Sequence, residues 1–156
     1  FSGLKRSLTE GGIRVPLIAR WPGKIKPSST SLHVGYFGDM MATWSELAGV
    51  SKLPAHDGIS FVPELTGKGK QGAHDYLYWE FYEKGVSQAV LLDGRWKALR
   101  LSSPTAAIQL YDVPADPSEK NDVATRYPDV IKRAASLFSS ARKDNTHWKL
   151  GTAPTP

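Results

Sequence analysis

The chain has 156 residues, of which 40% are hydrophobic and 22% charged, a composition that indicates a folded globular protein. No apolar run approaches the roughly 18 residues that span a bilayer, and the absence of cysteine excludes disulfides and thiolate chemistry. The net charge is +5, and residues 1–26 account for all of it, because they hold six basic residues against Glu10 alone. So local an excess favours a small anionic ligand, and we expect neither nucleic acid nor a membrane as a partner.

The first predicted element is a strand at residues 13–21, where apolar residues alternate along the chain. Ile18 adds an apolar residue to the opposite side, which is typical of a strand covered on both faces. Pro16 lacks an N–H, so we expect full pairing only beyond it or at a sheet edge. A helix is predicted over residues 37–48, and its stripe of apolar side chains predicts a face buried in the core.

The second half of the chain predicts a four-stranded antiparallel sheet, after a Gly- and Pro-rich connection with a short helical turn at residues 61–65. The strands are expected at residues 76–82, 87–92, 95–101 and 108–113, and Asp93-Gly94 is a strong hairpin signal. A helix from Pro128 to about residue 141 is expected to cover the sheet with its apolar stripe, and residues 146–156 to form a weakly packed tail.

Five segments, in chain order, resemble the type I sulfatases of the alkaline-phosphatase-like superfamily. They are KRSLTEGGIRVPLIARWPG (5–23), DMMATWSELAG (39–49), DGISFVPEL (57–65), HDYLYWEF (74–81) and QLYDVPADPSEKNDVA (109–124). The resemblance implies a fold of mixed α/β and α+β class, the C-terminal part of an alkaline-phosphatase-like α/β sandwich followed by the small sheet and its helix. It implies that residues 1–66 end the large domain, residues 67–145 form a small α+β subdomain, and residues 146–156 are a tail.

The resemblance also implies a catalytic role for Lys5, because in this family a lysine five residues before the Glu of Glu-Gly-Gly contacts the sulfate group. A fixed ammonium there would stabilise the negative charge that grows on the leaving oxygen. Arg14 is a candidate for a second anion contact or for a structural role. His74 is a candidate substrate contact at the subdomain junction, or a residue that only caps a loop. Gly11-Gly12 predicts either a turn that a β-carbon would block or a merely flexible one.

The same resemblance implies a complete enzyme that uses Ca²⁺ and a formylglycine nucleophile made from a Cys/Ser-x-Pro-x-Arg motif. That motif does not occur in the sequence, and the acidic residues are too scattered to predict a metal site. We therefore expect the chain alone to be inactive, to need an N-terminal catalytic portion and a sulfate-ester substrate, and to self-associate through residues 13–48. An exported or periplasmic location fits the family.

Two alternatives from other classes remain open on the sequence. One is a non-catalytic structural or carbohydrate-contacting module that folds independently of any active site. The other is part of a related phosphate or phosphonate monoester hydrolase.

Overall fold

A computed structural model of the chain describes residues 1–83 and 85–144. Contacts between residues divide it into two compact units. The sheet unit comprises residues 1–15 and the chain from Tyr76 onward, and the helical unit comprises residues 16–75. The tail predicted at residues 146–156 lies outside the described residues. Among the described residues there is no helix with both the length and the apolar character that a bilayer crossing requires.

The sheet unit is built on a four-stranded antiparallel sheet in the order β1-β2-β3-β4, which confirms the predicted sheet. The strands are β1 (Tyr76–Phe81), β2 (Ser87–Leu92), β3 (Trp96–Arg100) and β4 (Gln109–Asp112). Between β2 and β3, Asp93 and Gly94 have φ angles of 53° and 65°. These left-handed conformations are what a tight two-residue hairpin requires, which is why the Asp-Gly signal was reliable.

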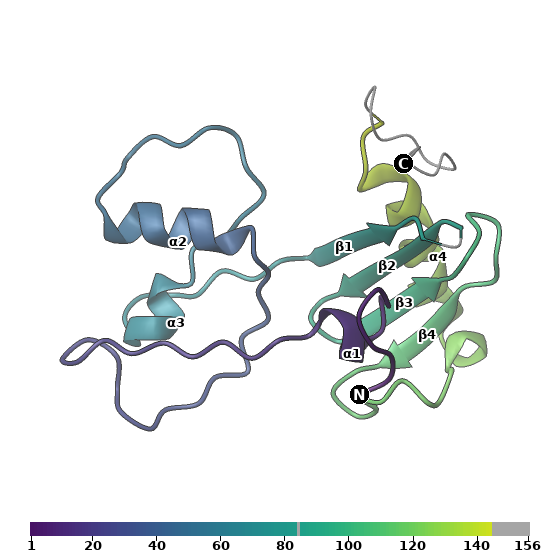
Figure 1. The fold of residues 1–156 in the computed structure, drawn as a ribbon, viewed down its shortest axis with the longest axis horizontal. Helices are drawn as coiled ribbons and strands as arrows, with labels where there is room; N and C mark the ends of the chain where they lie inside the picture. Colours follow the sequence, from purple (N-terminus) through teal and green to yellow (C-terminus); the bar gives the residue numbers. More distant parts are fainter. Residues whose placement is uncertain (84, 145–156) are drawn as a thin grey trace. The chain divides into compact units, whose positions relative to one another are not determined.

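Both faces of this sheet are covered, with α4 and α1 on opposite sides (Figure 1). Helix α4 (Pro128–Ser140) lies on the face where fully buried side chains form the main core cluster, Val90, Leu92, Ala98, Leu110, Ala134 and Phe138. The N-terminal segment covers the opposite face, where Leu8 packs against Ala89, Leu99 and Tyr111. This segment includes the single-turn helix α1 (Glu10–Ile13) and is therefore an integral layer of the sheet unit.

The helical unit contains α2 (Asp39–Leu47) and the short helix α3 (Val62–Thr66), both close to the predicted positions. Polar side chains of α2 fasten the loops around it. The fully buried Asp39 carboxylate accepts hydrogen bonds from the N–H groups of Tyr36 (2.9 Å) and Ile59 (2.8 Å). The Thr43 hydroxyl donates to the Asp39 carbonyl and accepts from the Phe61 N–H (3.1 Å). These bonds link α2 to the loop that leads into α3.

The predicted strand at residues 13–21 does not form in the described part of the chain. Ile13 ends α1, and residues 14–21 run without a ladder partner, with Ile18 91% exposed. A strand needs a neighbour to bond its N–H and C=O groups, and Pro16 removes one donor in any case.

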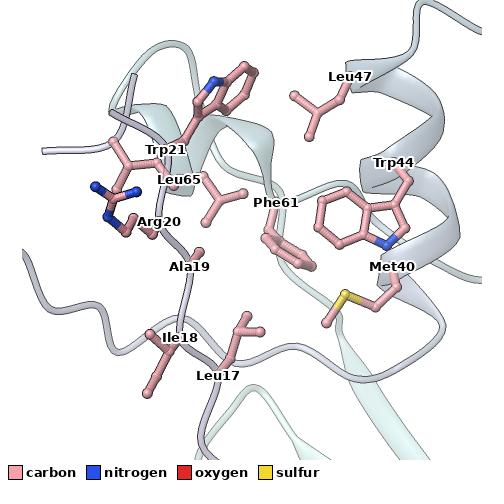
Figure 2. A pocket seen from close by; sticks show the side chains of 11 residues that line it. Leu17, Ile18, Ala19, Arg20, Trp21, Met40, Trp44, Leu47, Phe61 and Leu65 are labelled. Atoms are coloured by element: carbon pink, nitrogen blue, oxygen red, sulfur yellow. The ribbon is translucent and has the colours of Figure 1, made fainter. Parts of the chain in front are cut away.

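The predicted burial of the α2 apolar stripe is also wrong for the described residues. Phe37 is 75% exposed and Trp44 57% exposed, whereas the buried α2 residues are Asp39, Ala42 and Thr43. Three residues of the stripe, Met40, Trp44 and Leu47, line one wall of an open apolar groove of about 530 Å³, facing side chains of α3 and of residues 17–21 (Figure 2). Those few side chains fill too little of the groove to bury the stripe.

Candidate functional site

Lys5 lies in an exposed turn of the sheet unit. The turn spans residues 4–7 and is closed by a hydrogen bond from the Ser7 N–H to the Leu4 carbonyl (3.0 Å). Arg6, which follows in the left-handed conformation (φ 74°), pairs with Glu83 at 2.7 Å. Within residues 1–83 and 85–144, no carboxylate lies at ion-pair distance from the Lys5 ammonium. The ammonium is thus presented to solvent on a defined turn.

The two glycines after Glu10 allow the chain to fold back tightly onto this turn. A β-carbon on Gly12 would lie 2.1 Å from the Ser7 carbonyl oxygen and 2.8 Å from that of Leu4. One on Gly11 would lie 2.4 Å from the Gly3 carbonyl oxygen. Neither glycine has a positive φ, so their role is close backbone approach rather than an unusual backbone conformation.

Glu10 itself is buried and is held from three sides. Its Oε1 lies 2.8 Å from the ammonium of Lys97 on β3, and its backbone N–H donates to Oε2 of Glu119 at 2.7 Å. Its Oε2 accepts a longer bond from Arg14 at 3.3 Å. The glutamate of Glu-Gly-Gly therefore attaches the lysine segment to the sheet.

Arg14 is placed beside Glu10 rather than at a separate anion site. Its side chain is 49% exposed, and besides the Glu10 contact its guanidinium lies 4.9 Å from the centre of the Phe1 ring. These contacts give Arg14 a structural role, while half of its side chain stays accessible to a ligand. A substrate contact by Arg14 stays a prediction.

His74 belongs to the helical unit, whereas Lys5 belongs to the sheet unit. Its side chain is 11% exposed, and its Nε2 lies 2.8 Å from Oδ1 of the fully buried Asp39. The Tyr36 ring packs edge-on against the imidazole at 5.3 Å between centroids. These contacts hold the histidine at the end of the unit, and its role toward a substrate stays a prediction.

Sequence reasoning missed Lys97 and Glu119, which are both buried beside Glu10. Lys97 sits within the strand sequence WKALR, on the same face as Leu99, where an apolar residue is expected. A charged residue at such a position signals a buried ion pair, but its partners are 87 and 22 residues away in the sequence. Only the fold identifies them.

The described residues do not provide a fitting site for the Ca²⁺ that the family resemblance implies. Between residues 1 and 83 and between 85 and 144, no group of three or more His, Asp or Glu side chains is placed to hold a metal ion. Ca²⁺ takes six to eight oxygen ligands, so scattered carboxylates do not suffice. No step of the reaction is assigned to a metal held by this chain.

Comparison with known proteins defines the class. A family model described as "N-sulphoglucosamine sulphohydrolase, C-terminal" matches residues 4–143. An N-acetylgalactosamine-6-O-sulfatase of Bacteroides thetaiotaomicron is 31% identical over 162 residues, which cover 91% of this chain and 30% of that protein. An N-acetylglucosamine-6-O-sulfatase of the same organism is 30% identical and matches 89% of this chain and 26% of its own length.

The fold agrees with these matches. A solved structure, of a protein in complex with its substrate D-glucosamine-2-N,6-O-disulfate, superposes with a TM-score of 0.63 at 25% identity, over 78% of this chain and 26% of that one. The class is thus that of sulfatases, and within it the C-terminal part. The chain belongs to the N-sulphoglucosamine sulphohydrolase C-terminal family. It spans 30% or less of the length of the two curated relatives.

Proposed function

We propose that the chain is the C-terminal part of a sulfatase that hydrolyses a sulfate ester, and that Lys5 binds the sulfate group. The observation that carries the proposal is the exposed Lys5 ammonium on a turn that Gly12 and Glu10 fasten to the sheet. The turn falls inside the family match at residues 4–143, and the two curated relatives described above are named sulfatases.

The chemistry asked of Lys5 is electrostatic. As the S–O bond of a sulfate ester breaks, negative charge grows on the leaving oxygen, and a fixed ammonium stabilises that charge more than it stabilises the ground state. Calcium and a formylglycine, when present in the complete enzyme, supply the nucleophile and further charge neutralisation. Lys5 acts on the oxygen atoms of the sulfate, and the turn that carries it limits its freedom.

Arg14 and His74 are further candidates for substrate contacts. Arg14 is the more accessible of the two, with 49% of its side chain exposed against 11% for His74. The names of the relatives favour a sulfated hexosamine as the substrate class to test first. An aryl sulfate provides a second substrate without sugar contacts.

The test is the substitution Lys5→Ala in the complete enzyme that contains this chain. Removing one donor that acts on the developing charge costs on the order of 10²–10³ in kcat. We expect a loss of that size for sulfate release, with an unchanged melting temperature because the side chain is exposed.

The matched control is Arg6→Gln, which removes the neighbouring exposed cation and its surface pair with Glu83. Such pairs contribute about 0–1 kcal/mol, so we expect near-normal kcat and stability. A Lys5→Ala enzyme with near-normal kcat, or equal losses in both variants, would remove Lys5 from the mechanism.

A further inference from the structure

Lys97 is a fully buried lysine in the middle of β3, on the sheet face that the N-terminal segment covers. Its register partners on the adjacent strands are Leu91 and Tyr111. Moving an ammonium from water into such a site is costly unless its charge is matched there. Glu10 Oε1 at 2.8 Å and Glu119 Oε1 at 3.3 Å supply the match, the first as a hydrogen bond and the second as a charge contact.

The second carboxylate, that of Glu119, lies on a loop that is held in place by hydrogen bonds of its own. Glu119 has a left-handed backbone (φ 50°) in the loop after β4, and its N–H donates to the Asp116 carbonyl at 3.0 Å. The Asp116 carboxylate accepts from the next two N–H groups, those of Lys120 and Asn121, at 2.8 Å each. The loop is thus ordered by its own bonds, and Glu119 Oε2 accepts the Glu10 N–H from a defined position.

Contacts run continuously from this cluster to the turn that carries Lys5. Glu10 begins α1, and the Gly12 backbone lies directly against the carbonyls of Leu4 and Ser7, the first and last residues of the turn. The Gly11 N–H also donates to the Ser2 carbonyl at 2.7 Å. A shift of Glu10 would therefore move the backbone on which the turn rests.

We propose that Lys97 and Glu119 are positioning residues. They hold Glu10 in place, and Glu10 in turn fixes the position of Lys5, which binds the sulfate group. The proposal rests on the sulfate-binding role proposed for Lys5. A purely apolar side chain at position 97 would suit the sheet face itself. The positive charge of Lys97 has a different effect, because it holds the buried Glu10 of the N-terminal segment in a single position.

The test is a double-mutant cycle of Lys97→Met and Lys5→Ala in the complete enzyme, with kcat measured on folded protein. We expect Lys97→Met to lower kcat at least tenfold when Lys5 is present and to add no further loss in the Lys5→Ala background, because it acts through Lys5. Equal losses in both backgrounds, or no loss at all, would overturn the proposal.

The control for general destabilisation is Leu110→Ala, which opens the core on the opposite, α4-covered face. We expect it to lower the melting temperature and leave the kcat of the folded enzyme unchanged. If Lys97→Met fails to fold, Glu119→Ala takes its place in the cycle. This variant keeps the Lys97–Glu10 pair and removes the acceptor of the Glu10 N–H together with the 3.3 Å charge contact to Lys97.

A second readout separates this proposal from the role of Lys5 itself. Trypsin cleaves after Lys5 and Arg6, so we expect Lys97→Met to speed cleavage at these bonds under native conditions, and Leu110→Ala to do so much less. If Lys5→Ala leaves kcat intact, the proposed function fails, and the cleavage rates alone decide the positioning role. Equal cleavage in Lys97→Met and the parent would then overturn it.

Discussion

Glu80 shows how single residues join the edge of the sheet to the end of α4. Its carboxylate accepts hydrogen bonds from the hydroxyls of Tyr78 (2.7 Å) and Tyr82 (3.0 Å), and pairs with Arg142 at 2.8 Å. Burial alone would raise the pKa of Glu80, but the bonds from Arg142 and the two tyrosines outweigh it, so the pKa lies below its ordinary value of 4.5.

This shift sets the sign of a pH dependence. Because the folded protein depresses the pKa, Glu80 contributes stability above about pH 4.5 that is lost as the pH falls through the lower folded value. We expect Glu80→Gln to lower the free energy of unfolding at pH 7 by about 1.5–3 kcal/mol, and by less at pH 3. Urea denaturation at the two pH values measures this.

Glu83→Gln is the matched control, since Glu83 forms an exposed pair with Arg6 in which the side chains are 41% and 59% exposed. We expect a change below about 1 kcal/mol at either pH. A Glu80→Gln loss that does not shrink between pH 7 and pH 3 would contradict the assigned cause.

At the scale of elements, the sequence correctly predicted the helices and strands whose packing partners lie within the chain. The strands, the Asp93-Gly94 turn and α4 were predictable because their alternating or helical patterns meet their partners within the chain. Residues 14–21 and the α2 stripe carry equally clear patterns, but the described chain offers them no strand partner and little apolar cover. Their patterns therefore gave the wrong structure for the chain alone.

The site was predictable to the same limited degree. The family resemblance made Lys5 a candidate, and its role stays a prediction, whereas Lys97 and Glu119 meet Glu10 only through the fold of the sheet unit. For Gly11-Gly12 the structure favours the first of the two predicted alternatives, a backbone approach that a β-carbon would block, but the sequence did not predict the burial of Glu10.

The groove of the helical unit predicts self-association of the isolated chain. Trp44 and Ile18 line it and are 57% and 91% exposed, and burial stabilises by about 25 cal/mol per Å² of apolar surface. In a purified sample the available apolar partner is a second copy, and an unpaired backbone segment also templates pairing. We expect sedimentation at micromolar concentration to show a dimer or larger species.

The double substitution Ile18→Gln and Trp44→Gln should shift this chain to a monomer. Leu32→Gln is the control, because Leu32 is 93% exposed in the same unit but does not line the groove. A parent chain that sediments as a monomer would show that residues 13–48 do not drive association.

At the scale of the whole molecule, the chain carries a local excess of positive charge and the sequence of only the C-terminal part of a sulfatase. The excess of +5 lies in residues 1–26, where Arg6 and Arg14 contact carboxylates and Lys5 faces solvent. Three of the six basic residues, Lys5, Arg6 and Arg14, belong to the sheet unit, and the other three belong to the helical unit. The chain matches 30% of its N-acetylgalactosamine-6-O-sulfatase relative, and neither the formylglycine motif nor a metal cluster lies in its described part.

The most direct test of the account is sulfate release, measured side by side for the complete protein and for the 156-residue chain. We expect the complete protein to release sulfate from a sulfated hexosamine or an aryl sulfate, and the chain alone to release none. If the isolated chain releases sulfate, and Lys5→Ala abolishes this activity, the account is contradicted, because it places the nucleophile and the metal outside this chain. A complete protein that cleaves phosphonate or phosphate monoesters and leaves sulfate esters intact would contradict the proposed activity.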